Sequence, residues 1–192
     1  MIKNHPSLPL NPFYFIRHGE TDWNRRNIIM GSMDIPLNEL GLKQAHNASR
    51  LLENEHFDII ISSPRIRARQ TAEIIAKRIN KPIIFEEGIV ERTYGEAEGK
   101  PVDPTNSLFD DAHTPLGAES ASAFQQRVIE AVSALLLTEK FPLIVSHGGV
   151  FKALAYSFGY KTLSSANCVP FLFKPPNERK PSWAIYPLGE ES

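Results

Sequence analysis

Three short polar motifs contain the residue types that bind and attack phosphate. Arginine presents a planar fork of donors that matches phosphate oxygens, and a neutral histidine has a lone pair for nucleophilic attack. If the fold brings the motifs together, they predict a compact cationic pocket, to which helix N-termini add backbone N–H donors. The motifs are Arg17-His18-Gly19, Ser62-Ser63-Pro64 followed by Arg65-Ile66-Arg67, and Ser146-His147-Gly148-Gly149.

His18 is the candidate nucleophile. Its ring can attack phosphorus only when it is neutral and when an acceptor holds the other ring nitrogen, which fixes the tautomer. Gly19 allows the backbone to approach closely enough to do this. The chemistry predicted from these residues is phosphoryl transfer that needs no metal.

Helical geometry separates the arginines that follow Pro64. Arg65 and Arg69 are four residues apart and share a helical face, whereas Arg67 lies roughly 200° away from Arg65. Only one of these faces can point into the pocket, and the pattern leaves both options open.

The elements that must position the motifs alternate between strands and helices. This alternation predicts a largely parallel sheet with helices on both faces, and the ligand site lies beyond the carboxyl ends of its strands. We expect the three motifs to converge at that edge. Expected strands cover 13–16, 57–61, 82–85 and 143–145, expected helices cover 38–54, 64–79, 119–137 and 150–158, and two more short strands lie within 168–188.

Side chains that can cap a helix mark where three of these helices begin. Asn38 is the expected cap of the first helix, and Ser120 or Ser122 that of the third. Ser63 is the expected cap of the second helix, because proline suits the first helical position that Pro64 would occupy. The buried face of the first helix is expected to contain Leu42, Ala45, Ser49 and Leu52.

Length and composition favour one domain in the cytoplasm. The 192 residues can bury a single core, so one domain is expected over 1–192, with a loose lead-in at 1–11 and an irregular lid or specificity segment at 86–116. The net charge of −1 provides no field for nucleic acid or an anionic membrane, and the expected partner is a small phosphorylated substrate. No apolar run is typical of a secretion signal or a membrane span. Cys168 is expected to be buried and structural.

The motifs together resemble the histidine phosphatase superfamily, also called the phosphoglycerate mutase-like family. They occur in the family's order and span residues 13–160. The resemblance implies a single α/β domain, a three-layer sandwich with a mixed sheet between helices. The motifs that carry it are Arg17-His18-Gly19-Glu20-Thr21 with Trp23-Asn24, Ser62-Ser63-Pro64 through Arg67-Ala68 and Gln70-Thr71-Ala72, Glu91-Arg92 with Tyr94-Gly95, and Ser146-His147-Gly148-Gly149.

The resemblance implies roles for five catalytic residues. His18 is the nucleophile that becomes phosphorylated. Arg17, Arg67 and His147 bind the phosphoryl group. Glu91 is the general acid that protonates the leaving oxygen and later activates water.

The resemblance also bears on the rest of the pocket. Asn24 matches a position that often contacts the phosphate, and Gly148 belongs to the motif that binds it. Arg65 and Arg69 are expected to be rim or surface charges, and Arg65 stands where many family members have an apolar residue. No metal or cofactor is implied.

A phosphatase is the preferred reaction over a phosphoglycerate mutase. A mutase must hold a carboxylate-bearing substrate, which favours cationic groups in the loops above the phosphate. Residues 101–126 contain no Lys or Arg, and Thr93 stands where the mutase-like pattern has histidine. Acidic side chains take the place of cations in that stretch: Asp103, Asp110, Asp111 and Glu119.

Two alternatives come from other classes of protein. His18, His147 and Glu91 form the ligand set of a non-haem iron enzyme, although Arg17 would repel the cation. A non-catalytic phosphate-binding protein would retain anion affinity without turnover.

Overall fold

The computed structural model describes residues 8–102, 111, 114–139 and 141–189, and its centre is a six-stranded sheet in the order β3-β2-β4-β1-β5-β6. The first four strands of this order are parallel, whereas β5 and β6 run antiparallel. The arrangement confirms the predicted α/β fold, and each strand overlaps a segment in which the sequence predicts one. The strands are β1 (Phe13–Arg17), β2 (Ile59–Ser62), β3 (Ile83–Phe85), β4 (Pro142–Ser146), β5 (Pro170–Lys174) and β6 (Ala184–Pro187).

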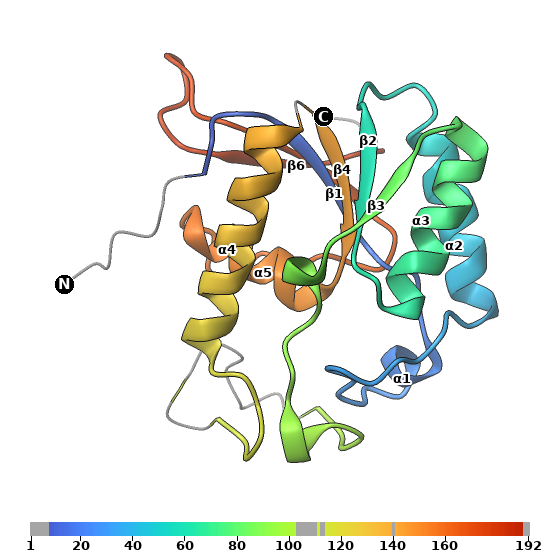
Figure 1. The fold of residues 1–192 in the computed structure, drawn as a ribbon. Helices are drawn as coiled ribbons and strands as arrows, with labels where there is room; N and C mark the ends of the chain where they lie inside the picture. Colours follow the sequence, from blue (N-terminus) through green and yellow to red (C-terminus); the bar gives the residue numbers. More distant parts are fainter. Residues whose placement is uncertain (1–7, 103–110, 112–113, 140, 190–192) are drawn as a thin grey trace.

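Helices cover both faces of the sheet. Figure 1 shows α2 and α3 on one side and α4 and α5 on the other. Side chains alternate along β1, so Phe13 and Phe15 pack into the core under α4 and α5, and Tyr14 and Ile16 into the core under α2 and α3. Leu42 is exposed, contrary to expectation, whereas the other residues predicted on that face are buried. The helices are α1 (Asp22–Arg25), α2 (Glu39–Leu51), α3 (Ile66–Ile79), α4 (Ala121–Thr138) and α5 (Gly148–Ser157).

Two of the three predicted helix caps are confirmed. The side chains of Asn38 and Ser120 each accept a hydrogen bond from a backbone N–H group in the first turn of α2 and of α4. The cap predicted at Ser63 is wrong, because α3 begins only at Ile66. The Ser63 hydroxyl instead accepts a bond from the backbone N–H of Arg65 and faces a histidine.

The segment 86–116 is irregular where the structure describes it. It contains two short 3-10 helices, η1 (Glu87–Ile89) and η2 (Gly95–Ala97). Its remaining residues at 103–110 and 112–113 lie outside the described residues, as do 1–7 of the expected lead-in. The role of the segment as a lid therefore stays a prediction. Within the described ranges, no helix is both long and apolar enough to cross a membrane.

Candidate active site

The three polar motifs meet at the carboxyl edge of the parallel strands. Arg17 and Ser146 are paired across β1 and β4. The backbone N–H of His18 donates to the carbonyl of Ser146 at 2.9 Å, and that of Ser63 donates to the carbonyl of Val145 at 3.0 Å. The fold thus brings the ends of β1, β4 and β2 together, as the sequence predicts.

The His18 ring is buried, with 2% of the residue exposed, and its tautomer is fixed by the backbone. Nδ1 lies 2.7 Å from the carbonyl oxygen of Gly19, which can only accept, so Nδ1 carries the proton and Nε2 has the lone pair. Burial lowers the pKa of His18 well below its usual range, and the charges of Arg67 and Arg17 lower it further. The ring is therefore neutral at physiological pH.

Gly19 also allows the chain after His18 to pack closely against the start of α2. A Cβ at this position would lie 2.5 Å from the carbonyl oxygen of Gly41, at the start of α2. The Gly19 N–H donates to the hydroxyl of Thr71 on α3 at 3.1 Å. The turn after His18 is thus packed against both helices on this face of the sheet.

His147 lies beside His18, with ring centroids 5.3 Å apart. It is fully buried, and its Nε2 is 2.8 Å from the Ser63 hydroxyl. Its Nδ1 makes no hydrogen bond to any described residue. Burial lowers the pKa of His147 well below its usual range, with further contributions from Arg67, His18 and Arg17.

Arg17 and Arg67 bring two guanidinium groups to the pocket. Arg17 donates to the carbonyl of Ser165 at 3.1 Å. Arg67 is fully buried and donates to the carbonyls of Met33 at 2.7 Å and Gly31 at 2.9 Å. The Nε of each arginine is buried and makes no hydrogen bond within the described ranges. Burial lowers both pKa values, that of Arg67 to about 10, and both groups stay cationic at neutral pH.

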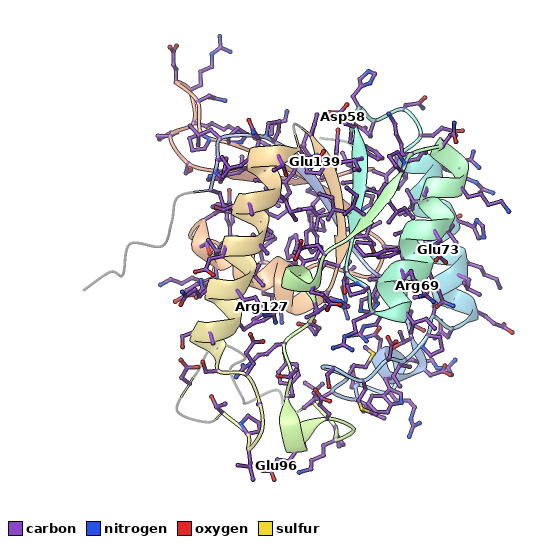
Figure 2. The ribbon with its side chains drawn as sticks, in the orientation of Figure 1. Asp58, Arg69, Glu73, Glu96, Arg127 and Glu139 are labelled. Atoms are coloured by element: carbon purple, nitrogen blue, oxygen red, sulfur yellow. The ribbon has the colours of Figure 1, made fainter. Side chains whose placement is uncertain are left out.

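Of the two arginines that the sequence places on one helical face, Arg69 lies on α3, whereas Arg65 lies before the helix. Figure 2 shows Arg69 and Glu73 together on α3, where they form an exposed ion pair at 3.6 Å. Arg65 precedes the helix and has an extended backbone with ψ 135°, so it does not share the face of Arg69. Its side chain is partly buried, with an inaccessible Nε, which fits a charge at the rim of the pocket rather than on the open surface.

Glu91 is fixed by backbone donors from two segments. One carboxylate oxygen accepts from the N–H of Gly149 at 3.0 Å, and the other accepts from the N–H of Arg92 at 3.0 Å. A Cβ on Gly149 would lie 2.1 Å from the carboxylate, so only glycine leaves room for it. The negative charge of Glu91 raises the pKa of Arg17 and of Arg67 against the effect of burial, which places Glu91 near both cations.

An ion pair holds the chain just before Glu91. Arg127 of α4 makes two bonds to the carboxylate of Glu119, at 2.9 and 2.7 Å, and also donates to the carbonyls of Gly88 and Val90. Figure 2 shows Arg127 on α4, beside the η1 segment. Glu119, one of the acidic residues expected above the pocket, is thus used in this contact.

Asn24 and Gly148 both make local contacts at the edge of the pocket, and their contact with phosphate stays a prediction. The Asn24 side-chain oxygen accepts from the N–H of Thr21 in the capping box of α1, and Asn167 reaches the same oxygen at 3.5 Å. Gly148 begins α5, and a Cβ there would touch the Arg17 guanidinium at 3.4 Å.

Sequence reasoning missed Ser165 and Asn167. Asn167 donates to the carbonyl of His18 at 2.8 Å. The Ser165 carbonyl binds Arg17, while its buried hydroxyl makes no hydrogen bond to any described residue. Both precede β5, whose antiparallel direction brings its amino end to the site. A polar Ser-Ala-Asn stretch just before an apolar run was the available signal.

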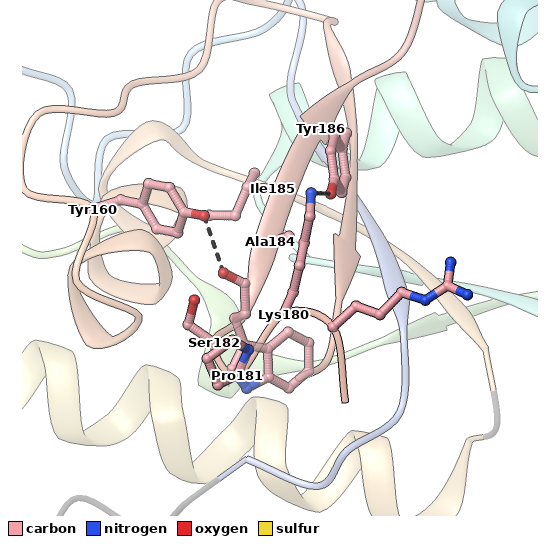
Figure 3. Close-up of a pocket in the computed structure, with 9 residues that line it drawn as sticks. Tyr160, Lys180, Pro181, Ser182, Ala184, Ile185 and Tyr186 are labelled. Carbon is pink, nitrogen blue, oxygen red and sulfur yellow. Dashed lines mark hydrogen bonds between the residues drawn. The ribbon is translucent and has the colours of Figure 1, made fainter. Parts of the chain in front are cut away.

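The hollow drawn in Figure 3 lies at the other end of the sheet. It is lined by Tyr160 and by residues 179–186. Strand pairing aligns Ala184 with Lys174 and Phe173 with Phe13, the first residue of β1. His18 follows the last residue of β1, so this hollow does not belong to the site.

His18, His147 and Glu91 are not grouped as metal ligands. Across the described ranges, no cluster of three or more His, Cys, Asp or Glu side chains could hold a metal ion. The charges next to His18 are the cations Arg17 and Arg67, an environment that suits an anion.

Comparisons with known proteins agree with this geometry. Residues 13–171 match the sequence model of the histidine phosphatase superfamily (branch 1). The chain is 36% identical over 141 residues to the uncharacterized phosphatase PhoE of Bacillus subtilis, covering 72% of each chain. It is 34% identical over 148 residues to the probable phosphoglycerate mutase GpmB of Yersinia pestis, covering 70% of this chain and 68% of that one. A mycobacterial glucosyl-3-phosphoglycerate phosphatase has the same fold, with a TM-score of 0.79, 23% identity, and coverage of 91% and 97%.

Proposed function

This chain belongs to the histidine phosphatase superfamily and is a phosphatase-type enzyme, and we propose that it hydrolyses a small phosphomonoester through a phosphohistidine at His18. One observation carries the proposal: Nδ1 of a buried, neutral His18 is bound to the Gly19 carbonyl, and Nε2 therefore has the lone pair. The positive charges of Arg67 and Arg17 act on this ring. A net charge of −1 supports a small substrate rather than nucleic acid or an anionic membrane.

In the proposed complex, Arg17, Arg67 and His147 bind the phosphoryl oxygens. Their buried Nε and Nδ1 atoms make no hydrogen bonds within the described chain, and phosphate oxygens would satisfy them. We assign the Ser63 O–H as the donor to Nε2 of His147, because this leaves the His147 proton on Nδ1 for the phosphate. The N-terminus of α5 at Gly148 and the side-chain amide of Asn24 complete the proposed set.

The proposed reaction has two steps. In the first, Nε2 of His18 attacks phosphorus in line with the leaving oxygen, which receives the proton of Glu91 in its carboxylic acid form and leaves as the alcohol. In the second, Glu91 takes a proton from water, which attacks the phosphohistidine and releases inorganic phosphate. The arginines stabilise the charge on the equatorial oxygens, and no step requires a metal.

Turnover tests the proposal directly. A panel of sugar phosphates, phosphoglycerates, nucleotides and phosphopeptides is assayed with and without EDTA, using wild type, His18→Ala and His46→Ala. His46 is an exposed residue of α2 and is the matched control for loss of an imidazole. We expect EDTA-resistant activity that only His18→Ala abolishes. Full activity in His18→Ala, or loss of activity with EDTA, contradicts the proposal.

Trapping the intermediate tests the mechanism separately. Rapid acid-free quenching with a ³²P-labelled substrate should label wild type at His18, with a bond that is stable in alkali and labile in acid. His18→Ala should remain unlabelled. Labelling at another residue would leave the phosphatase activity in place but remove His18 as nucleophile.

Mutase activity and simple phosphate binding are distinguished by product analysis. Incubation with 3-phosphoglycerate and a bisphosphorylated primer should release inorganic phosphate, with little 2-phosphoglycerate. Efficient conversion to 2-phosphoglycerate would make the mutase the correct reaction. Phosphate affinity without turnover on any substrate would indicate a non-catalytic protein.

A further inference from the structure

Arg65 lies next to the proposed phosphate pocket, although the proposed reaction does not use it. Its backbone N–H donates to the Ser63 hydroxyl at 3.3 Å, and the same hydroxyl is 2.8 Å from Nε2 of His147. Arg65 is the residue before α3, and Arg67 is in the first turn. Because its backbone is extended rather than helical, Arg65 is not held to the outer face of α3 with Arg69.

The Arg65 side chain is partly buried, and its guanidinium group has no hydrogen-bond or ion-pair partner among the described residues. Its Nε is inaccessible and makes no hydrogen bond, and no carboxylate in the described ranges forms an ion pair with it. Two carboxylates close to this segment are used elsewhere. Asp34 accepts from the backbone N–H of Ile66, and Glu98 accepts from Ser32 and from the N–H of Tyr94. Glu98 is close enough to interact electrostatically with Arg65, but it accepts no hydrogen bond from the guanidinium group, whose donors are therefore available to an anionic ligand.

The charge of Arg65 extends into the pocket. Burial is the main cause of the lowered pKa of both His147 and Arg67, and the positive charge of Arg65 lowers both further. Arg65 also lowers the pKa of Glu98, against the effect of burial. The guanidinium group therefore acts on groups of the site and not only on solvent.

We propose that Arg65 binds a second anionic group of the substrate, a carboxylate or a second phosphate on the leaving-group side, and selects substrates that have one. The inference rests on the proposed phosphatase function of the same pocket. Arg17, Arg67 and His147 suffice for the transferred phosphoryl group, so a third guanidinium is available for the remainder of the molecule. Residues 101–126 contain no Lys or Arg that could bind a substrate carboxylate, and Arg65, just before α3, would then provide that cation.

Matched substrate pairs test this role. 3-Phosphoglycerate and glycerol 3-phosphate differ by a carboxylate, and fructose 1,6-bisphosphate and fructose 6-phosphate differ by a second phosphate. We expect wild type to have the higher kcat/KM for the charged member of one pair, which identifies the group. Arg65→Met should lower that ratio by about tenfold or more, the value of a charge-assisted hydrogen bond. Arg65→Lys should retain part of the kcat/KM ratio between the two members of the pair. The surface control Arg69→Met should retain the full ratio.

Affinity measurements separate this inference from the proposed function. Calorimetry measures the affinity of His18→Ala for both members of each pair, with and without Arg65→Met. It gives the ratio of the two affinities without turnover. An equal loss for both members of each pair, or an unchanged ratio, overturns the role of Arg65. Loss of hydrolysis on every substrate, with the affinity ratio still dependent on Arg65, instead contradicts the phosphatase proposal alone.

Discussion

Two buried histidines should make the folded state less stable in mild acid. Burial lowers the pKa of His18 and of His147 well below the usual value, whereas in the unfolded chain both titrate near about 6.5. Below that pH the unfolded state binds protons that the folded state does not, so stability rises with pH in this window and falls as the pH decreases.

The magnitude follows from the number of protons. A histidine that stays neutral in the folded state contributes about 1.4 kcal/mol of lost stability between about pH 7.5 and 5.5, so the pair contributes about 2.7 kcal/mol. This is an upper value, reached when both folded-state pKa values lie below the window. It is a large fraction of the free energy of unfolding of an ordinary domain, which is roughly 5–15 kcal/mol.

Urea unfolding in phosphate-free buffers at several pH values across the window measures the effect. The comparison is between slopes, because a substitution in the pocket also changes the overall stability. His18→Gln and His147→Gln should each make the pH dependence shallower by about 1.4 kcal/mol over the window. His46→Gln, which removes an imidazole from the exposed face of α2, is the matched control. Parallel curves for wild type and both pocket variants would refute the reasoning, because the rings would then be protonated in the folded state.

Three other substitutions test how the site is held. Gly149→Ala places a methyl group 2.1 Å from the Glu91 carboxylate, and kcat should fall by about 10²-fold while competitive inhibition by phosphate persists; loss of phosphate inhibition as well would contradict this role of Glu91. Arg127→Met removes the bidentate ion pair with Glu119 and the two carbonyl contacts before Glu91. The free energy of unfolding in urea should fall by about 1–3 kcal/mol, and kcat should fall as well. An unchanged kcat in the destabilised variant would show that Arg127 does not position Glu91. Ser63→Ala leaves Nε2 of His147 without its hydrogen-bond partner, and kcat/KM should fall by about tenfold. The pH dependence of the folding stability above neutral pH should not change. A wild-type kcat/KM in this variant would exclude orientation of His147 by Ser63.

The elements were predictable because their signals are local. Apolar runs before Arg17 and before Ser146 mark buried strands, and Asn38 caps α2 through a bond to its own first turn. Ser63 has the same local signal but a different role. Its hydroxyl lies at the edge where β2 meets β4, and His147, which follows β4, competes for it. The sequence cannot show that competition, because it depends on which strands are neighbours.

The residue types predicted a phosphate pocket, and the family resemblance selected Arg67 and Glu91 as candidate residues of it. The orientation of the side chains was not predictable, because backbone atoms provide most of it. A carbonyl sets the tautomer of His18, two carbonyls hold Arg67, and two N–H groups hold Glu91. Every residue has these groups, so no sequence pattern marks the ones that are used. The side chains that give a signal are those that fix the loops, such as Glu98, which binds Ser32 between the two carbonyls that hold Arg67. The position of the Arg67 guanidinium therefore depends on a carboxylate that never touches it, and the same loop borders the segment where Arg65 lies.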